Sequence, residues 1–215
     1  MIALPQGMAP LPSSPAGVTP DPSPLPALAR SLGATEAVLL PAEALVIDER
    51  YAAMCAAPHR CPGYGLAPGC PPHAPSPADF RARLAEYRLV VVFKIDAPVA
   101  ELLNEEQRRR LARTVHRIAA GLEQAAPALG FARAAGMAAG SCKELFCADA
   151  AACAVLDGSG PCRCPDLARP SLSAVGIDFA ALAALAGWSF TRIGSETETS
   201  DPPAMGLMAG LVLLA

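Results

Sequence analysis

LVVVFKID, at residues 89–96, is the clearest strand in the sequence and decides the fold class. Its β-branched residues form a nearly continuous apolar run, which is typical of a central strand buried on both faces. EAVLLP, at residues 36–41, predicts a shorter buried strand upstream. FARAAGMAAGSC, at residues 131–142, predicts a strand of small residues, and MGLMAGLVLLA, at residues 205–215, predicts a buried strand that ends the fold.

Helices are predicted between these strands. In SPADFRARLAEY, residues 76–87, Ser76 suits an N-cap and Pro77 the first helical position. A longer helix over residues 104–126 has one apolar stripe, formed by Leu111, Val115, Ile118 and Leu122. Its other side carries Arg108, Arg109, Arg113 and Arg117, and we expect His116 to be exposed among them. FAALAALAGW, at residues 179–188, predicts a short helix.

Strands that alternate with helices predict an α/β or α+β fold. We expect a small mixed sheet with flanking helices and two cysteine-rich irregular segments. Residues 1–33 are a proline-rich lead, with eight prolines in the first 26 positions and Asp21 as the only charge among those 26. This lead lacks the apolar surface that would offset its ordering entropy, so we predict that it is disordered. Residues 34–215 are predicted to form a single metal-binding domain.

Charge and hydropathy limit the partners and the compartment. The formal net charge is −3, so no basic field predicts a nucleic-acid partner. The first residues have no basic region of a signal peptide, and the apolar C-terminal run of 11 residues is about half a membrane span. We therefore expect a cytoplasmic protein without a membrane partner, whose thiols stay reduced and are available for metal binding.

The eight cysteines fall into two groups in turn-rich sequence. Cys55, Cys61 and Cys70 form the first group, and the second group consists of Cys142, Cys147, Cys153, Cys162 and Cys164. Residues 71–141 contain no cysteine, whereas scattered core cysteines would not separate in this way. This segregation is the strongest chemical signal in the chain and predicts a metal site.

The spacing of the second group favours an iron–sulfur cluster over zinc. It reads C-x4-C-x5-C-x8-C-x-C, whereas structural zinc sites usually show paired C-x2-C knuckles. Three cysteines are followed by proline, as in bacterial ferredoxin runs: Cys61, Cys70 and Cys164. We expect four thiols of the second group to bind a [4Fe–4S] cluster: Cys142, Cys147, Cys153 and Cys162. Cys164 would then be a spare thiol. Zinc and a disulfide or redox switch remain alternatives.

The first group supplies only three cysteines, within the proline-rich stretch CPGYGLAPGCPPH at residues 61–73. It suits either a second cluster, completed by His59, His73 or an open iron, or a lid over the first cluster. Tyr64 is a candidate to shield a cluster or donate a hydrogen bond to it, with a half-buried turn aromatic as the alternative. Arg163 and Arg169 are candidates to compensate cluster charge or to bind an anionic partner, with pairing to local carboxylates as the alternative.

The chain resembles the DUF2284 family of predicted metal-binding proteins over residues 34–215. The motifs that carry the resemblance are CPGYGLAPGCPP, GSCKELFC, PCRCPDLARPSLSAVGID and the closing apolar strand. The resemblance implies cysteine-based metal binding in both groups, with an iron–sulfur cluster as the expected metal. It implies no reaction. Here the gaps of the second group are wider than in many members, and Cys164 stands where histidine is common.

The expected function is that of an electron-transfer or metal-cofactor accessory protein that carries a [4Fe–4S] cluster. Its expected partner is a redox or cofactor-assembly protein. One alternative is a redox or Lewis-acid enzyme whose cluster keeps an open iron, which the three-cysteine first group would allow. Another alternative is a zinc-stabilised interaction module. No serine–histidine–acid arrangement or pair of catalytic carboxylates is evident in the sequence.

Overall fold

The fold is built on a four-stranded antiparallel sheet. The computed structural model describes residues 19–56, 58, 61–190 and 205–215. The strand order is β1-β2-β4-β3, with the bounds β1 Glu36–Pro41, β2 Leu89–Pro98, β3 Ala134–Met137 and β4 Met205–Leu214. All four lie where the sequence predicts strands. The class is α+β, and each pairing is antiparallel, so the expectation of a mixed sheet is corrected.

The two long central strands divide the core into two layers. β2 and β4 pair over ten residues, from Leu89 opposite Leu214 to Pro98 opposite Met205. Alternate side chains of β2 point to opposite faces, so Val91 and Phe93 enter one core cluster while Val90 enters the other. This confirms that β2 is a central strand buried on both faces.

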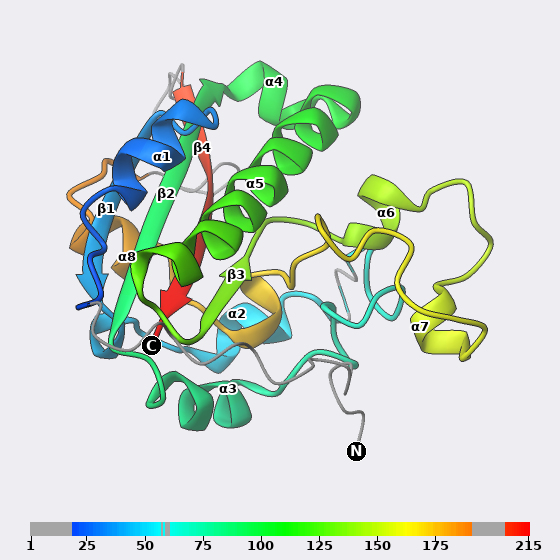
Figure 1. Ribbon diagram of the computed structural model, residues 1–215. Coiled ribbons are helices and arrows are strands. Elements are labelled where there is room, and N and C mark those ends of the chain that lie inside the picture. Colours follow the sequence, from blue (N-terminus) through cyan, green and yellow to red (C-terminus); the bar gives the residue numbers. More distant parts are fainter. Residues whose placement is uncertain (1–18, 57, 59–60, 191–204) are drawn as a thin grey trace.

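Helices cover both faces of this sheet. On one face lie α1 (Leu25–Ser31) and α5 (Glu105–Ala125), with α5 in front of the sheet in Figure 1. On the other face lie α3 (Pro77–Leu84) and α8 (Phe179–Leu185). The N-cap at Ser76 is confirmed, because its hydroxyl accepts a hydrogen bond from the Asp79 amide at 3.1 Å.

The N-terminal lead is ordered further than its composition predicts. Residues 1–18 lie outside the described residues, but α1 is a helix that places Leu25 and Ala29 in the core at 0% exposure. The prediction of disorder is therefore wrong for residues 25–31. Burial of these two apolar side chains against α5 and β1 supplies the stabilisation that a count of prolines does not reveal.

The remaining elements are short. They are α2 Glu49–Ala53, α4 Val99–Leu103, α6 Cys142–Phe146 and α7 Ala154–Asp157, with 3₁₀ turns η1 Ala42–Ala44, η2 Ala126–Leu129 and η3 Ser173–Val175. Figure 1 shows α6, α7 and the loops around them beside the sheet, away from its packed faces. Among the helices of the described ranges, none is long and apolar enough to cross a membrane.

Candidate metal centre

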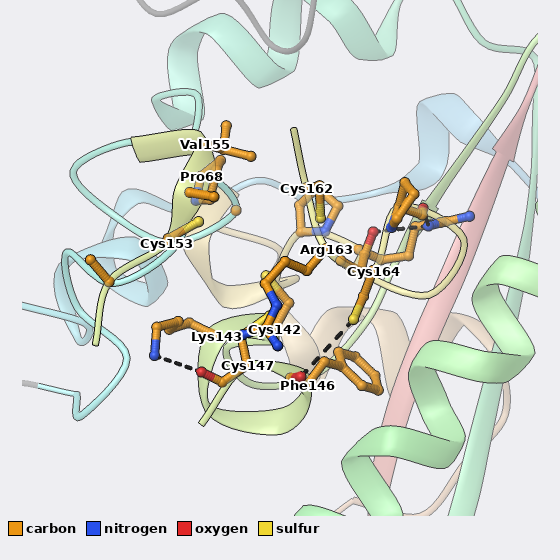
Figure 2. Close-up of a pocket in the computed structure, with 17 residues that line it drawn as sticks. Pro68, Cys142, Lys143, Phe146, Cys147, Cys153, Val155, Cys162, Arg163 and Cys164 are labelled. Carbon is orange, nitrogen blue, oxygen red and sulfur yellow. Dashed lines mark hydrogen bonds between the residues drawn. The ribbon is translucent and has the colours of Figure 1, made fainter. Parts of the chain in front are cut away.

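All five cysteines of the second group line one cavity of about 270 Å³. The cavity lies between α6, α7 and the loop that follows α7, and Figure 2 shows the sulfur-bearing side chains gathered around it. The five are Cys142, Cys147, Cys153, Cys162 and Cys164. A single water needs only about 10–15 Å³ of such space, so the cavity has room for a group of several atoms.

Short local structures position these thiols. Cys142 is the first residue of α6, and Cys147 follows its last turn. The Lys143 ammonium group closes the next loop, because it donates to the carbonyl oxygens of Cys147 at 2.8 Å and Ala150 at 2.7 Å. Cys153 is the N-cap residue of α7. Each of these thiols is therefore held by backbone that is ordered through its own hydrogen bonds.

The thiols lie in an environment that disfavours unpaired negative charge. Burial raises the pKa of Cys142 to about 12, and the nearby Cys70, Cys162 and Cys153 thiols add to the rise. Burial also raises the pKa of Cys147, and the neighbouring Cys164 thiol acts in the same direction. Such thiols become thiolates when a metal cation supplies the compensating charge, so the donor set fits a bound thiophilic metal.

Three cationic side chains also line the cavity: Lys143, Arg163 and Arg169. Arg163 makes an exposed ion pair with Asp149 at 3.1 Å. Arg169 pairs with Glu123 at 2.9 Å, and the Arg169 side chain is only 9% exposed. The predicted pairing with local carboxylates is therefore confirmed for both arginines, and both also line the cysteine cavity.

The first cysteine group lies next to this cavity without lining it. Pro68 and Gly69, just before Cys70, do line it. A Cβ atom on Gly69 would lie 2.7 Å from the Pro170 backbone, so only glycine permits this contact between the two cysteine segments. The Gly69 carbonyl also accepts a hydrogen bond from the Ser171 amide at 3.2 Å. The tertiary structure thus packs one predicted site segment against the other.

The three thiols of the first group differ in exposure. Cys61 is exposed, Cys55 is intermediate and Cys70 is buried. Burial raises the pKa of Cys70 to about 11, while the nearby Ser141 hydroxyl opposes the rise. Because Ser141 directly precedes Cys142, Cys70 is the member of this group that lies closest to the second group.

Other predicted residues lie away from the sulfur-lined cavity. Tyr64 and His73 line a separate open hollow near α3, together with Pro71 and Pro72. Tyr64 therefore does not line the five-cysteine cavity and does not shield it in this arrangement. His59 lies outside the described residues.

His116 corrects the prediction from the sequence, because it is fully buried and not exposed on α5. Its Nδ1 atom accepts a hydrogen bond from the Arg169 amide at 3.1 Å, and its ring meets the edge of Phe146 at a centroid distance of 5.2 Å. His116 thereby joins α5 to the segment that carries Cys164. The small residues Ala112, Ala119 and Ala120 beside it are the signal that another segment packs closely there.

Two further residues of the site are not singled out by sequence motifs. Glu123, on α5, accepts from both Arg169 and the Gly136 amide. Phe146 lines the cavity and presents its carbonyl oxygen 4.0 Å from the Cys164 sulfur. Their roles depend on contacts between residues that are far apart in the sequence, which spacing alone does not encode.

The cysteine thiols surround the cavity and do not converge on a single position within it. Within the described ranges, no three His, Cys, Asp or Glu side chains lie close enough together to hold one metal ion. The second-group thiols nevertheless share one cavity, whose volume of about 270 Å³ has room for a group of several atoms.

These features define an α+β protein in which a cysteine-lined cavity lies beside an antiparallel sheet. The chain belongs to the DUF2284 family, described as predicted metal-binding proteins, whose family model matches residues 38–214. The family indicated by the cysteine motifs is thus confirmed, together with metal binding as its predicted property. No curated protein and no solved structure is significantly similar to the chain.

Proposed function

We propose that the protein is a cytoplasmic iron–sulfur protein that serves as an electron-transfer or metal-cofactor accessory. One observation carries the proposal: five cysteine thiols surround a single cavity of about 270 Å³. A polynuclear cluster bridges thiolates that are too far apart for one ion, which suits both the size of the cavity and the spread of its donors.

The proposed ligands to a [4Fe–4S] cluster are the four thiols Cys142, Cys147, Cys153 and Cys162. When bound, such a cluster would supply one-electron redox chemistry. Cys164 lines the same cavity and its thiol is directed to the Phe146 carbonyl at 4.0 Å, which suits its proposed role as a spare thiol.

The cavity wall supports this assignment. Pro68, Pro165, Pro170 and Phe146 contribute apolar surface to it, and the five thiols are only partly exposed. Arg163 opposes the rise that burial causes in the pKa of Cys147, and Lys143 and Arg169 place further positive charge on the cavity wall. Solvent exclusion and nearby charge are the factors by which a protein adjusts the potential of an iron–sulfur cluster.

A zinc-stabilised interaction module is the competing interpretation. Structural zinc sites are tetrahedral, with Zn–S distances of about 2.3 Å, which requires four donors to converge on one point. The sulfur-lined cavity is larger than such a site needs, and this favours the cluster.

Anaerobic purification followed by visible spectroscopy and metal analysis tests the proposal. We expect a brown protein with iron and acid-labile sulfide. Cys142→Ser and Cys162→Ser should lose iron, whereas Cys164→Ser should retain it. A colourless protein with stoichiometric zinc would refute the iron–sulfur assignment. Iron loss in Cys164→Ser, with retention in Cys153→Ser, would replace one proposed ligand by another.

A further inference from the structure

A second hollow, of about 490 Å³, lies along the side of α5 that faces α6. We call it the arginine groove. It is lined by Arg110, Leu111, Arg113, Thr114, Arg117, Phe146 and Leu167. Arginine and aromatic side chains are the types enriched at protein–protein interfaces, and the groove combines them with aliphatic surface. The composition of the groove therefore suits a protein partner.

The charge of the groove is positive and only partly neutralised. Arg110 pairs with Glu106 one turn earlier in the helix. Arg113 donates from Nε to the Leu145 carbonyl at 2.8 Å, and Arg117 donates to the Thr114 hydroxyl at 2.8 Å. The last two guanidinium groups are thus held in place by neutral acceptors, which leaves their charge available to a partner.

This positive charge is local, because the chain as a whole carries a formal charge of −3. A partner drawn to the groove must therefore be acidic and must contact a limited surface, since the rest of the molecule repels it. A long polyanion such as a nucleic acid would meet that repulsion along its length, whereas a small acidic protein can meet the groove alone.

The groove and the cysteine-lined cavity share one wall. Phe146 lines both hollows, and Figure 2 places its ring at the edge of the cavity, next to Cys147 and Cys164. Arg113 binds the carbonyl oxygen of Leu145, the residue before Phe146. A partner seated in the groove would therefore be separated from the cysteine-lined cavity by the thickness of one residue.

We propose that the arginine groove is the docking surface for a small acidic electron-carrier protein. The acidic character of the partner follows from the charge of the groove. Its class as an electron carrier rests on the proposed function, because the groove adjoins the cavity to which a redox cluster is assigned. Cationic side chains at the rim steer such a partner and make its association sensitive to salt.

Binding of an oxidised acidic [2Fe–2S] ferredoxin to the full chain, at low and at high ionic strength, tests the proposal. Arg110→Glu/Arg117→Glu reverses two exposed charges of the groove and leaves Arg113 in place. The matched control, Arg30→Glu/Arg83→Glu, makes the same change in net charge at exposed positions on α1 and α3. We expect the groove variant to bind the ferredoxin at least about tenfold more weakly than the control variant at low salt.

The expected result also includes a weaker salt dependence in the groove variant than in the control. Equal affinity of the two variants would overturn the proposal. Stronger competition by phosphate than by chloride at equal ionic strength would make the groove a small-anion site and overturn it too. Self-association that depends on the same arginines, measured by sedimentation, would identify a second copy of the chain as the occupant and likewise overturn it.

Metal analysis of the same samples separates this proposal from the previous one. Binding that depends on the arginines in a protein without iron would leave the docking surface intact and refute the cluster. Iron present at full content in the groove variant, with ferredoxin affinity unchanged, would refute the docking surface and leave the cluster intact.

Discussion

Acidification should destabilise the fold through His116, which is fully buried between α5 and the segment around Arg169. Burial lowers the pKa of this imidazole to about 4 from its usual 6.5, and the charge of Arg169 acts in the same direction. The carbonyl groups of Leu167 and Ala139 oppose the shift and are outweighed. The folded state therefore holds His116 neutral.

The sign of the effect follows from proton binding. Between pH 6.5 and about 4 the unfolded chain takes up a proton at His116 that the folded chain excludes. Stability is thus complete above the unfolded pKa and falls as the pH is lowered through this window. Between about pH 7 and pH 5 the loss amounts to about 2 kcal/mol. Since small domains have unfolding free energies of about 5–15 kcal/mol, this loss is readily measured.

Urea unfolding followed by the fluorescence of Trp188, the single and buried tryptophan, measures the effect across this pH range. His116→Asn keeps an acceptor near the position of Nδ1 and removes the titrating group. Its loss of stability between about pH 7 and pH 5 should therefore be smaller than that of the wild type by about 2 kcal/mol. His73→Asn serves as the control, because His73 lies in a loop at the separate hollow near α3. Metal content is measured in parallel, since protons compete with metals for thiolates.

One result would refute this reasoning. If His116→Asn retained the full pH dependence of the wild type at equal metal content, the buried imidazole would not be the group that takes up the proton on unfolding. Flattening of the pH dependence in His73→Asn would point to the same conclusion.

Two further predictions concern the packing and the charges that hold the cavity. Gly69→Ala places a Cβ 2.7 Å from the backbone of the second cysteine segment. It should lower the free energy of unfolding, measured in urea, by about 1–3 kcal/mol. The control Gly160→Ala adds its Cβ in open space and should stay within about 1 kcal/mol of the wild type. Equal effects would show that the two cysteine segments are not packed this tightly. Glu123→Gln leaves the buried Arg169 charge without its carboxylate and should lower the free energy of unfolding by about 3 kcal/mol. The control Glu86→Gln breaks an exposed ion pair and should lower it by less than about 1 kcal/mol. Similar losses from these two substitutions would argue that the Arg169 pair is hydrated.

The elements of the fold were largely predictable, because they depend on local periodicity. β2 combines β-branched residues with burial on both faces, and α5 carries an apolar stripe at helical spacing. The antiparallel arrangement was not predictable in this way. β4 lies between β2 and β3, and a run of apolar residues has no preferred direction relative to strands that are far away in the sequence.

The candidate site was predictable in its chemistry and not in its geometry. Grouping of the cysteines in two turn-rich segments indicates a metal site, since scattered core cysteines would not separate in this way. The burial of His116 is not predictable from its neighbours, because arginines flank it in the sequence and the segment that buries it comes about 50 residues later. Glu123 and Phe146 likewise gain their roles only from such distant contacts.

The sequence by itself determined the four strands, the longer helices α3 and α5, and which side chains bring metal-binding chemistry. Tertiary structure alone decided that five thiols share one cavity, that the CPGYGLAPGCPPH segment packs beside the cavity without adding a cysteine to its wall, and that Phe146 separates the cavity from the arginine groove. The physical reason is that periodicity and turn chemistry act over a few residues. Proximity between segments depends on how the whole chain buries its apolar surface.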